Sequence, residues 1–213
     1  MNFIPEALDH YAVEHTQPEP ELLAQLSRET FQKVLQPRML SGHYQGRLLS
    51  LLSKIIAPQR ILEIGTYTGY SALCLAEGLR TDGELHTIDI NEELTDLQKK
   101  YFELSPYKEQ IHPHLGDALE IIPQLSGTFD LVFMDADKPN YPAYFDLIIE
   151  KINPGGILLT DNVLWSGKVV EEVKEDDIST IALLKYNKMV AEDERLETIL
   201  LPVRDGLSIT RVK

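Results

Sequence analysis

Apolar and polar positions divide the chain into a helical first part and a longer second part in which strands and helices alternate. Before residue 57, apolar side chains recur twice at helical spacing, first around Leu22, Leu26 and Phe31 and then through residues 45–56. Pro58 follows directly and cannot continue a helix. We therefore expect two helices ahead of the main fold, as a helical extension over residues 1–57.

From Arg60 onward, short apolar runs alternate with stretches of helical spacing. The runs that predict strands are 60–64, 84–89, 111–115, 129–134 and 156–160. The stretches that predict helices are 71–79, 92–104, 118–124, 141–152 and 178–191. Repeated strand-helix units favour an α/β fold, a parallel sheet with helices on both faces.

The end of the chain has a different pattern. Residues 196–201 and 207–212 read as two strands joined by a turn at Asp205-Gly206, which predicts an antiparallel hairpin. Residues 166–179 are polar and acidic, and we expect a loop there. With 213 residues and 43% apolar content, the chain suits one domain, whose core spans residues 58–213.

Composition also favours a reducing, cytoplasmic setting without a membrane. No apolar run approaches the ~20 residues that span a bilayer, and residues 1–6 lack the pattern of a signal peptide. The only cysteine, Cys74, cannot form an internal disulfide. A net charge of −14 disfavours nucleic acid as a partner, although basic residues are frequent between Arg28 and Arg60, where a solvated helix face is the simpler interpretation.

Two predicted strands end abruptly in oxygen ligands. Phe133-Met134 leads into Asp135, and Leu158-Leu159-Thr160 leads into Asp161-Asn162. Adjacent parallel strands bring such ends together at one rim of the sheet, so these three side chains could hold one divalent cation. Lys138 follows nearby as a candidate base, and the alternative is a plain ion pair between Lys138 and Asp137.

The turn after the first strand has the pattern Glu63-x-Gly65-x-x-x-Gly69, which lets a ligand approach the backbone and a helix N-terminus. The turn lacks the third glycine of dinucleotide-binding turns. The alternative to a ligand-binding role is a tight turn that only connects the strand to its helix. Asp89 ends the second strand, where its carboxylate could accept hydrogen bonds from the hydroxyls of a ribose. The alternative is that Asp89 caps the next helix, although Asn91 is better placed to do so. Asp117 could contact an adenine or equally cap residues 118–124.

Three segments together resemble one enzyme family. They are Glu63-Ile64-Gly65-Thr66-Tyr67-Thr68-Gly69-Tyr70-Ser71, Asp135-Ala136-Asp137-Lys138-Pro139-Asn140-Tyr141 and Asp161-Asn162-Val163-Leu164-Trp165-Ser166-Gly167. This ordered set is similar to the cation-dependent O-methyltransferases that use S-adenosylmethionine, above all the caffeoyl-CoA type and its bacterial homologues, and more distantly catechol O-methyltransferase. The resemblance covers about residue 19 to the C-terminus.

The resemblance implies a Rossmann-like class I methyltransferase fold, with a seven-stranded, mostly parallel sheet whose last strand is antiparallel. It implies Mg²⁺, Mn²⁺ or Ca²⁺ at Asp135, Asp161 and Asn162, with Lys138 as the general base. It places Trp165 beside the acceptor ring and makes a homodimer the usual assembly. The residues that it implies around S-adenosylmethionine are Ser41, Glu63, Gly65, Tyr67, Ser71, Asp89, Asp117, Ala118 and Asp135.

Two departures from the family pattern bear on the acceptor. Residues 17–21 are acidic where the plant enzymes use basic residues for coenzyme A phosphates, which argues against a coenzyme A thioester. His43 stands in an altered stretch before Gly46 and could line the acceptor pocket.

The leading hypothesis is a metal-dependent O-methyltransferase acting on a small aromatic vicinal diol, a catechol or a hydroxycinnamate. A lysine becomes a useful base only when its pKa is lowered, which a nearby divalent cation would do. The alternatives are a methyltransferase acting on hydroxylated uridine in tRNA and a cofactor-binding protein without turnover. A nicotinamide-dependent dehydrogenase is a weaker alternative, because the turn after the first strand lacks the third glycine of the dinucleotide-binding pattern.

Overall fold

Seven strands form one sheet in the computed structural model, which describes residues 5–213. In chain order they are β1 (Arg60–Ile64), β2 (Glu84–Asp89), β3 (Ile111–Leu115), β4 (Phe129–Met134), β5 (Ile152–Asp161), β6 (Leu196–Leu201) and β7 (Leu207–Val212). The spatial order is β3-β2-β1-β4-β5-β7-β6, and the first five strands are mutually parallel. β7 runs antiparallel to both β5 and β6, which confirms the α/β fold and the antiparallel last strand.

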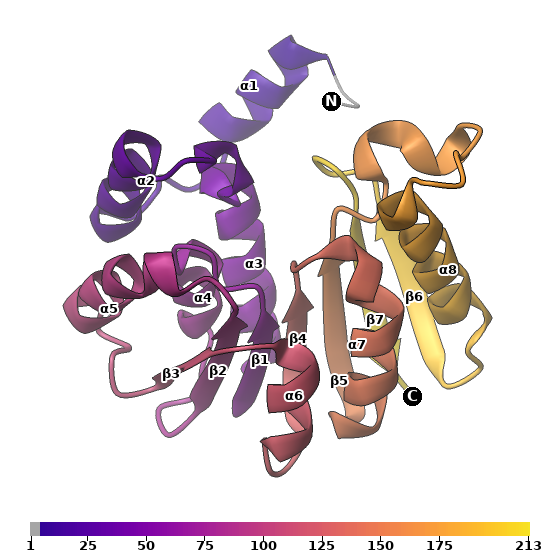
Figure 1. Cartoon of the computed structure of the whole chain (residues 1–213). Coiled ribbons are helices and arrows are strands. Elements are labelled where there is room, and N and C mark those ends of the chain that lie inside the picture. The colour runs from indigo at the N-terminus through magenta and orange to yellow at the C-terminus, as the bar shows by residue number, and fades with distance from the viewer. Residues whose placement is uncertain (1–4) are drawn as a thin grey trace.

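Eight α-helices surround this sheet in the described part of the chain (Figure 1). They are α1 (Glu6–Glu14), α2 (Glu21–Lys33), α3 (Gly42–Ile56), α4 (Tyr70–Ala76), α5 (Thr95–Leu104), α6 (Ala118–Ile121), α7 (Tyr141–Ile148) and α8 (Ile178–Glu192). Short 3-10 turns accompany them at η1 (Pro37–Met39), η2 (Glu92–Leu94), η3 (Ile122–Gln124), η4 (Lys138–Asn140), η5 (Ile149–Lys151) and η6 (Trp165–Val170).

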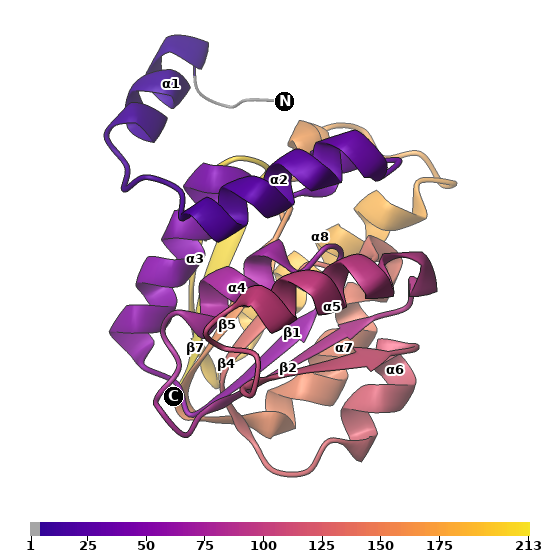
Figure 2. The same cartoon turned by 90° about the vertical axis from the view of Figure 1, so that its left-hand side faces the viewer.

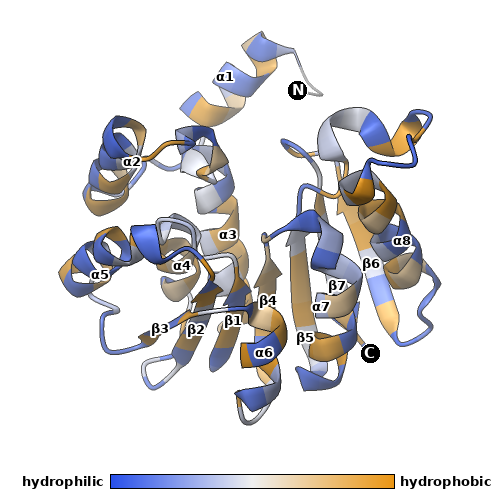
Figure 3. Ribbon diagram, in the orientation of Figure 1, coloured by the Kyte–Doolittle hydropathy of each residue, from blue (hydrophilic) through white to orange (hydrophobic). Residues whose placement is uncertain are grey.

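Alternate side chains of the central strands pack into two separate hydrophobic cores, one on each face of the sheet. Leu62 and Val132 pack with the helices α6, α7 and α8, whereas Ile61, Leu131 and Phe133 pack with α2, α3, α4 and α5. A period of two along each strand produces this division, because successive side chains point to opposite faces. Figures 1 and 2 show the two sets of helices on opposite sides of the sheet, and Figure 3 shows apolar strands between helices with polar outer faces.

The sheet order creates one position where the chain changes direction. β1 pairs with β2 on one side and with β4 on the other, so the connections from β1 and from β4 leave in opposite directions. A crevice forms at the carboxyl ends of such strands, and ligands of open α/β sheets bind there. The fold therefore brings the ends of β1, β2, β4 and β5 to one rim.

The structure corrects several expected bounds. The helix expected over 141–152 is wrong at its end, because residues 149–151 form the 3-10 turn η5 and β5 begins at Ile152. α4 stops at Ala76 rather than near residue 79, since Gly78 lies so close to α3 that a Cβ there would approach Ser53 backbone within 2.2 Å. The expected loop 166–179 contains most of η6 and the start of α8.

α1 is an element that the apolar pattern did not predict. It buries none of its residues and projects beyond the body of the molecule in both views (Figures 1 and 2). Residues 1–4, on which the expected lack of a signal peptide partly depends, lie outside the described residues. Within residues 5–213, no helix has both the length and the apolar character needed to cross a bilayer.

A partly buried ion cluster joins α3 to the end of α4. Glu77 receives hydrogen bonds from Arg47 at 2.6 and 3.1 Å, from Lys54 at 2.6 Å and from Ser50 at 2.7 Å. Burial alone would raise the pKa of the Glu77 carboxyl, but these donors outweigh it and lower the pKa from 4.5 to about 2. The cluster therefore stabilises the folded chain only while Glu77 is ionised.

This cluster predicts how stability depends on pH. A carboxyl with a lowered pKa in the folded state contributes stability above pH 4.5, and that contribution is lost as the pH falls toward 2. Between pH 7 and pH 3 the native chain should lose about 2 kcal/mol of unfolding free energy through this group. The variant Glu77→Gln should be less stable at pH 7 but lose correspondingly less on acidification. Urea unfolding at several pH values measures both, and equal pH profiles would contradict the assignment.

Candidate active site

A cavity of about 1410 Å³ opens at the carboxyl ends of the sheet strands. Side chains from the ends of β1, β2, β4 and β5 line it, together with the segment between α2 and α3. Of the residues predicted for the site, those that line the cavity are Ser41, Gly65, Tyr67, Ser71, Asp89, Asp117, Ala118, Asp135, Lys138, Asp161, Asn162 and Trp165. Glu63 and His43 are not among the lining residues.

The loop after β1 comes within contact distance of the loop after β4. Gly65 has φ +102°, and a Cβ on it would lie 2.2 Å from the Asp135 carbonyl oxygen. The backbone N–H of Asp135 donates to Ile64 O at 2.9 Å, and the N–H of Gly65 donates to Ile88 O at 2.9 Å. Only glycine fits this conformation and this close approach, so the predicted glycine requirement has a physical basis at Gly65.

One end of the cavity presents two acids that are held by backbone donors. Asp89 accepts the N–H of Tyr67 at 2.6 Å and the N–H of Asn91 at 2.8 Å, and Asn91 itself caps η2. Asp117 caps α6 by accepting the N–H of Leu119 at 2.8 Å, while it also lines the cavity. The capping and ligand-binding interpretations are compatible, because each carboxylate has further lone pairs for a ligand.

Tyr67 connects this end to two neighbouring elements. Its hydroxyl donates to Gln36 O at 2.8 Å, and its carbonyl accepts from Gln98 of α5 at 2.7 Å. Its φ of +49° is uncommon for a tyrosine, and the contacts on both sides hold it there. The ring of Tyr67 thereby fixes the chain before α3 against the cavity.

Glu63 lies beneath the glycine loop rather than on the cavity wall. Its side chain is fully buried, and Thr87 donates to its Oε2 at 2.5 Å. Burial raises the pKa of Glu63 to about 8, against hydrogen bonds from Ser71 and Thr87 that lower it. The structure thus gives Glu63 a buried position outside the cavity lining, where Thr87 holds it.

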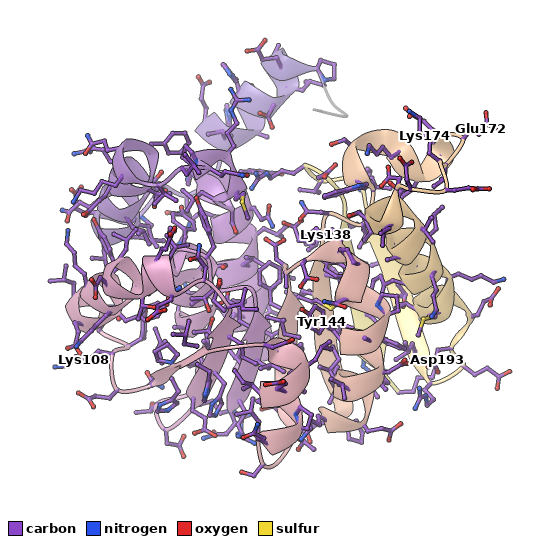
Figure 4. All side chains as sticks on the ribbon, in the orientation of Figure 1. Lys108, Lys138, Tyr144, Glu172, Lys174 and Asp193 are labelled. Carbon is purple, nitrogen blue, oxygen red and sulfur yellow. The ribbon has the colours of Figure 1, made fainter. Side chains whose placement is uncertain are left out.

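The other end of the cavity holds the predicted acid and lysine cluster. The Lys138 ammonium donates to Asp135 Oδ1 at 3.0 Å, to Ala136 O at 3.0 Å and to the Tyr141 hydroxyl at 2.7 Å. Tyr141 in turn donates to the Asp161 carbonyl at 3.2 Å. Figure 4 shows Lys138 and Tyr144 near the middle of the molecule, whereas Lys108 and Asp193 lie at its periphery.

The alternative interpretation of Lys138 as a partner of Asp137 is wrong. Asp137 instead accepts the Tyr144 hydroxyl at 2.5 Å and the Asn140 amide at 2.7 Å. The reason is that η4 begins at Lys138, which turns its side chain back toward the end of β4. Sequence reasoning gave no role to Tyr141, although its position three residues after Lys138 on a helical turn was a usable signal.

Asp135 and Asp161 suit a cation between them. Burial raises the pKa of Asp161, and the nearby negative charge of Asp135 raises it further, while Gln45 and Lys138 act in the opposite direction. A hard cation such as Mg²⁺ would relieve that repulsion, and the side-chain oxygen of Asn162 is a suitable third ligand. Residues 5–213 contain no cluster of three or more His, Cys, Asp or Glu side chains arranged for a metal. Any cation here would therefore depend on the amide and on ligand oxygens from outside the chain.

Two further residues support Asp161, and no local sequence pattern predicts either of them. Gln45 of α3 donates to Asp161 Oδ2 at 2.7 Å. Arg204, in the turn between β6 and β7, donates to Gln45 Oε1 at 2.7 Å and also to the Ser41 carbonyl. The three residues are more than 40 positions apart in the chain, so only the fold brings them together.

The two predicted acceptor residues differ in placement. Trp165 lines the cavity and also packs against the α7 and α8 core, and its buried indole N–H has no partner among the described residues. His43 lies outside the lining, where a ring nitrogen is 2.6 Å from the Gln17 carbonyl. That contact joins α3 to the segment before α2, so the His43 ring has a structural role at this position.

Comparisons with known proteins agree on one family. A family model described as O-methyltransferase matches residues 13–213. Caffeoyl-CoA O-methyltransferase 5 of Nicotiana tabacum is 35% identical over 204 residues, which cover 91% of this chain and 85% of that protein. Caffeoyl-CoA O-methyltransferase 1 of Eucalyptus globulus is 36% identical over 203 residues, covering 91% and 82%.

Solved structures resemble the whole chain as well. The O-methyltransferase from Bacillus cereus in complex with SAH has a TM-score of 0.90 and 29% identity, covering 97% of both chains. The O-methyltransferase TomG from Streptomyces achromogenes, involved in tomaymycin synthesis and solved with SAM, has a TM-score of 0.88 and 29% identity, covering 97% of this chain and 96% of TomG.

The contact between Gly65 and Asp135 predicts an unequal response of two glycines to the same substitution. Gly65→Ala and Gly155→Ala both place a side chain at positive φ, but near Gly155 the closest atom is an Arg211 nitrogen at 3.9 Å. We expect Gly65→Ala to lower the unfolding free energy by about 1–3 kcal/mol more than Gly155→Ala, measured by urea unfolding. Only Gly65→Ala should also shift the emission of Trp165, the single tryptophan. Equal losses and unchanged emission would show that the close approach is not required.

Proposed function

Because the chain belongs to the O-methyltransferase family and is an S-adenosylmethionine-dependent enzyme, we propose that it methylates a small aromatic vicinal diol that a divalent cation holds in the cavity. The observation that carries this proposal is the cluster of Asp135, Lys138 and Asp161 on one cavity wall. Binding of the methyl donor alone would not need a buried lysine or a second buried acid. Catechols and free hydroxycinnamates are the acceptors that fit this arrangement.

The methyl donor would occupy the end of the cavity that Gly65, Asp89 and Asp117 line. Asp89 and Asp117 are held by backbone donors, so their free lone pairs are aimed before any ligand binds. Such preorganisation matters because methyl transfer is an in-line displacement that requires fixed alignment of donor and acceptor. The close approach of the Gly65 and Asp135 loops brings the two ends of the cavity together.

The residues proposed to hold the cation are Asp135, Asp161 and Asn162. A bound divalent cation would orient the two diol oxygens and lower the pKa of the hydroxyl that receives the methyl group. Gln45 would keep one oxygen of Asp161 in place, since it donates to Oδ2. These three ligands leave positions of a six-coordinate ion free for the diol.

Lys138 is proposed to take up the proton of the reacting hydroxyl. Of its three hydrogen bonds, two go to neutral oxygens and only that to Asp135 goes to a charged group. A divalent cation held by Asp135 would compete with this bond and disfavour a second positive charge beside it, so that Lys138 in its neutral form could accept the proton of the acceptor hydroxyl. Burial raises the pKa of Tyr141 well above its usual value, so this hydroxyl stays protonated and keeps Lys138 and Asp161 in position.

Charge pairing in the N-terminal part supports a small acceptor over tRNA. Several basic residues of that region are already paired with acids, namely Lys33 with Glu29, Arg47 and Lys54 with Glu77, and Arg60 with Glu84. Paired cations offer little to a phosphate backbone, and the net charge is −14. Glu19, in the acidic segment that argued against a coenzyme A thioester, binds the Tyr70 hydroxyl at 2.5 Å.

The metal requirement gives the first test. With labelled S-adenosylmethionine and Mg²⁺, we expect label on a catechol or a hydroxycinnamate, and no label when EDTA is present. Asp161→Ala should lose activity by about 100-fold or more, because it removes a proposed ligand, whereas Asp146→Ala on the exposed side of α7 should not. Full turnover of Asp161→Ala in EDTA would exclude the metal mechanism. Label on tRNA alone would favour the RNA-modifying alternative.

The proposed base gives a second test. Lys138→Met should lower kcat by about 100-fold or more with little change in the KM for the diol, since the proton acceptor is lost. Lys185→Met replaces an exposed lysine of α8 and serves as the matched control. Steady-state kinetics at saturating Mg²⁺ measure both variants. A Lys138→Met enzyme with native kcat would remove Lys138 from the chemistry.

A further inference from the structure

Arg204 brings a positive charge to the acceptor end of the cavity from an unexpected part of the fold. It lies in the turn between β6 and β7 and lines the cavity together with Asp161, Asn162 and Trp165. Its φ is +51°, a conformation uncommon for arginine. This conformation belongs to the turn that joins β6 to β7 and brings the side chain to the cavity wall.

The guanidinium of Arg204 has no acidic partner among residues 5–213. Its hydrogen bonds run from one nitrogen, Nη1, to the Ser41 carbonyl and to Gln45 Oε1, both neutral. By contrast, Lys33, Lys100 and Lys138, which also line the cavity, each pair with a carboxylate. Most of the cavity's other ionisable residues are acids. Arg38 also lines the cavity without an acidic partner among residues 5–213, but only Arg204 is anchored there by hydrogen bonds.

The hydrogen bonds of Arg204 anchor it without using up its binding capacity. With Nη1 held, Nε and Nη2 have no hydrogen-bond partner in the described part of the chain. Two neighbouring N–H groups of a guanidinium match the two oxygens of a carboxylate, and this bidentate pairing is the geometry in which arginine binds most strongly. An anchored guanidinium with a free edge is therefore well prepared to bind a carboxylate.

Gln45 sets the spacing between this charge and the proposed metal site. Its side-chain amide accepts from Arg204 with one atom and donates to Asp161 Oδ2 with the other, at 2.7 Å each. Arg204 Nη1 and Asp161 Oδ2 are consequently no more than about 8 Å apart. An aromatic ring with a short acidic side chain has a similar length, so its diol could reach the cation while its carboxylate reaches Arg204.

We infer that the acceptor of this enzyme carries a carboxylate, that this carboxylate pairs with Arg204, and that Arg204 therefore determines which diols are methylated. The inference rests on the proposed function, since it concerns the acceptor of that reaction. It names the substrate class as dihydroxy-aromatic acids, in preference to neutral diols, amines or esters of the same shape. Trp165 lines the same cavity and is the residue proposed to flank the acceptor ring.

The test compares diols that share the same ring and differ in the charge of the side chain. They are 3,4-dihydroxyphenylacetate, its methyl ester and the matching amine, each assayed with labelled S-adenosylmethionine and Mg²⁺. For the native enzyme, kcat/KM should be at least about 10-fold higher for the acid than for the ester, as expected for a charge-assisted bidentate pair. The amine should be the poorest acceptor, because it would meet Arg204 with like charge.

Variants separate a role in specificity from a role in structure. Arg204→Gln should bring the ratio of acid to ester close to one, mainly by raising the KM for the acid, and Arg204→Lys should restore part of the ratio. Arg38→Gln, at a second arginine that lines the cavity but does not contact Gln45, should leave the ratio as in the native enzyme. A purely structural role of Arg204 would lower kcat for all three diols equally and leave the ratio unchanged.

The outcomes distinguish this inference from the function on which it rests. Methylation of acid and ester with equal efficiency by the native enzyme would overturn the inference and leave the diol methyltransferase intact. An unchanged ratio in Arg204→Gln would do the same. Failure to methylate any diol, with S-adenosylmethionine bound, would overturn the proposed function and this inference with it.

Discussion

The contact between the loop after β1 and the loop after β4 is the constraint on which the rest of the site depends. Gly65 and the Asp135 carbonyl approach each other so closely that no Cβ fits between them. This approach occurs where the sheet order reverses, between β1 and β4, and it places the proposed methyl-donor end of the cavity beside the acid and lysine cluster. Moving either loop would separate the two halves of the reaction, because in-line transfer tolerates little misalignment.

The acid and lysine cluster beside this contact buries charge. Lys138 and Asp161 are both nearly inaccessible to water, and each is stabilised by named neighbours: Asp135, Ala136 and Tyr141 for the lysine, and Gln45 for the acid. Such groups would be costly to bury unpaired. The arrangement leaves the repulsion between Asp135 and Asp161 partly uncompensated, which a divalent cation is suited to relieve.

Much of this organisation could be predicted from the sequence, because strand-helix alternation and the abrupt ends of the apolar runs are local signals. The strands β1 to β4 and both strands of the hairpin have the bounds expected from apolar periodicity, and Asp135, Lys138 and Asp161 were found from their place after strands. Tertiary packing decided what failed: Gly78 against Ser53 ends α4 early, and η4 turns Lys138 away from Asp137. Gln45 and Arg204 could not be found, since no local pattern joins a helix, a strand end and a hairpin turn across the chain.

The antiparallel strand β7 has a consequence for how this enzyme could diversify. β6 carries the chain to the cavity rim and β7 leaves the rim antiparallel to β5, so the turn from Leu201 to Leu207 lies beside Asp161. This turn is a short surface connection, and lengthening such a connection adds only slowly to the entropy of loop closure. The cavity wall proposed for the acceptor can thus change at this turn while the proposed methyl-donor end, built on β1 and β2, stays unaltered. New acceptors could be acquired there without refolding the sheet.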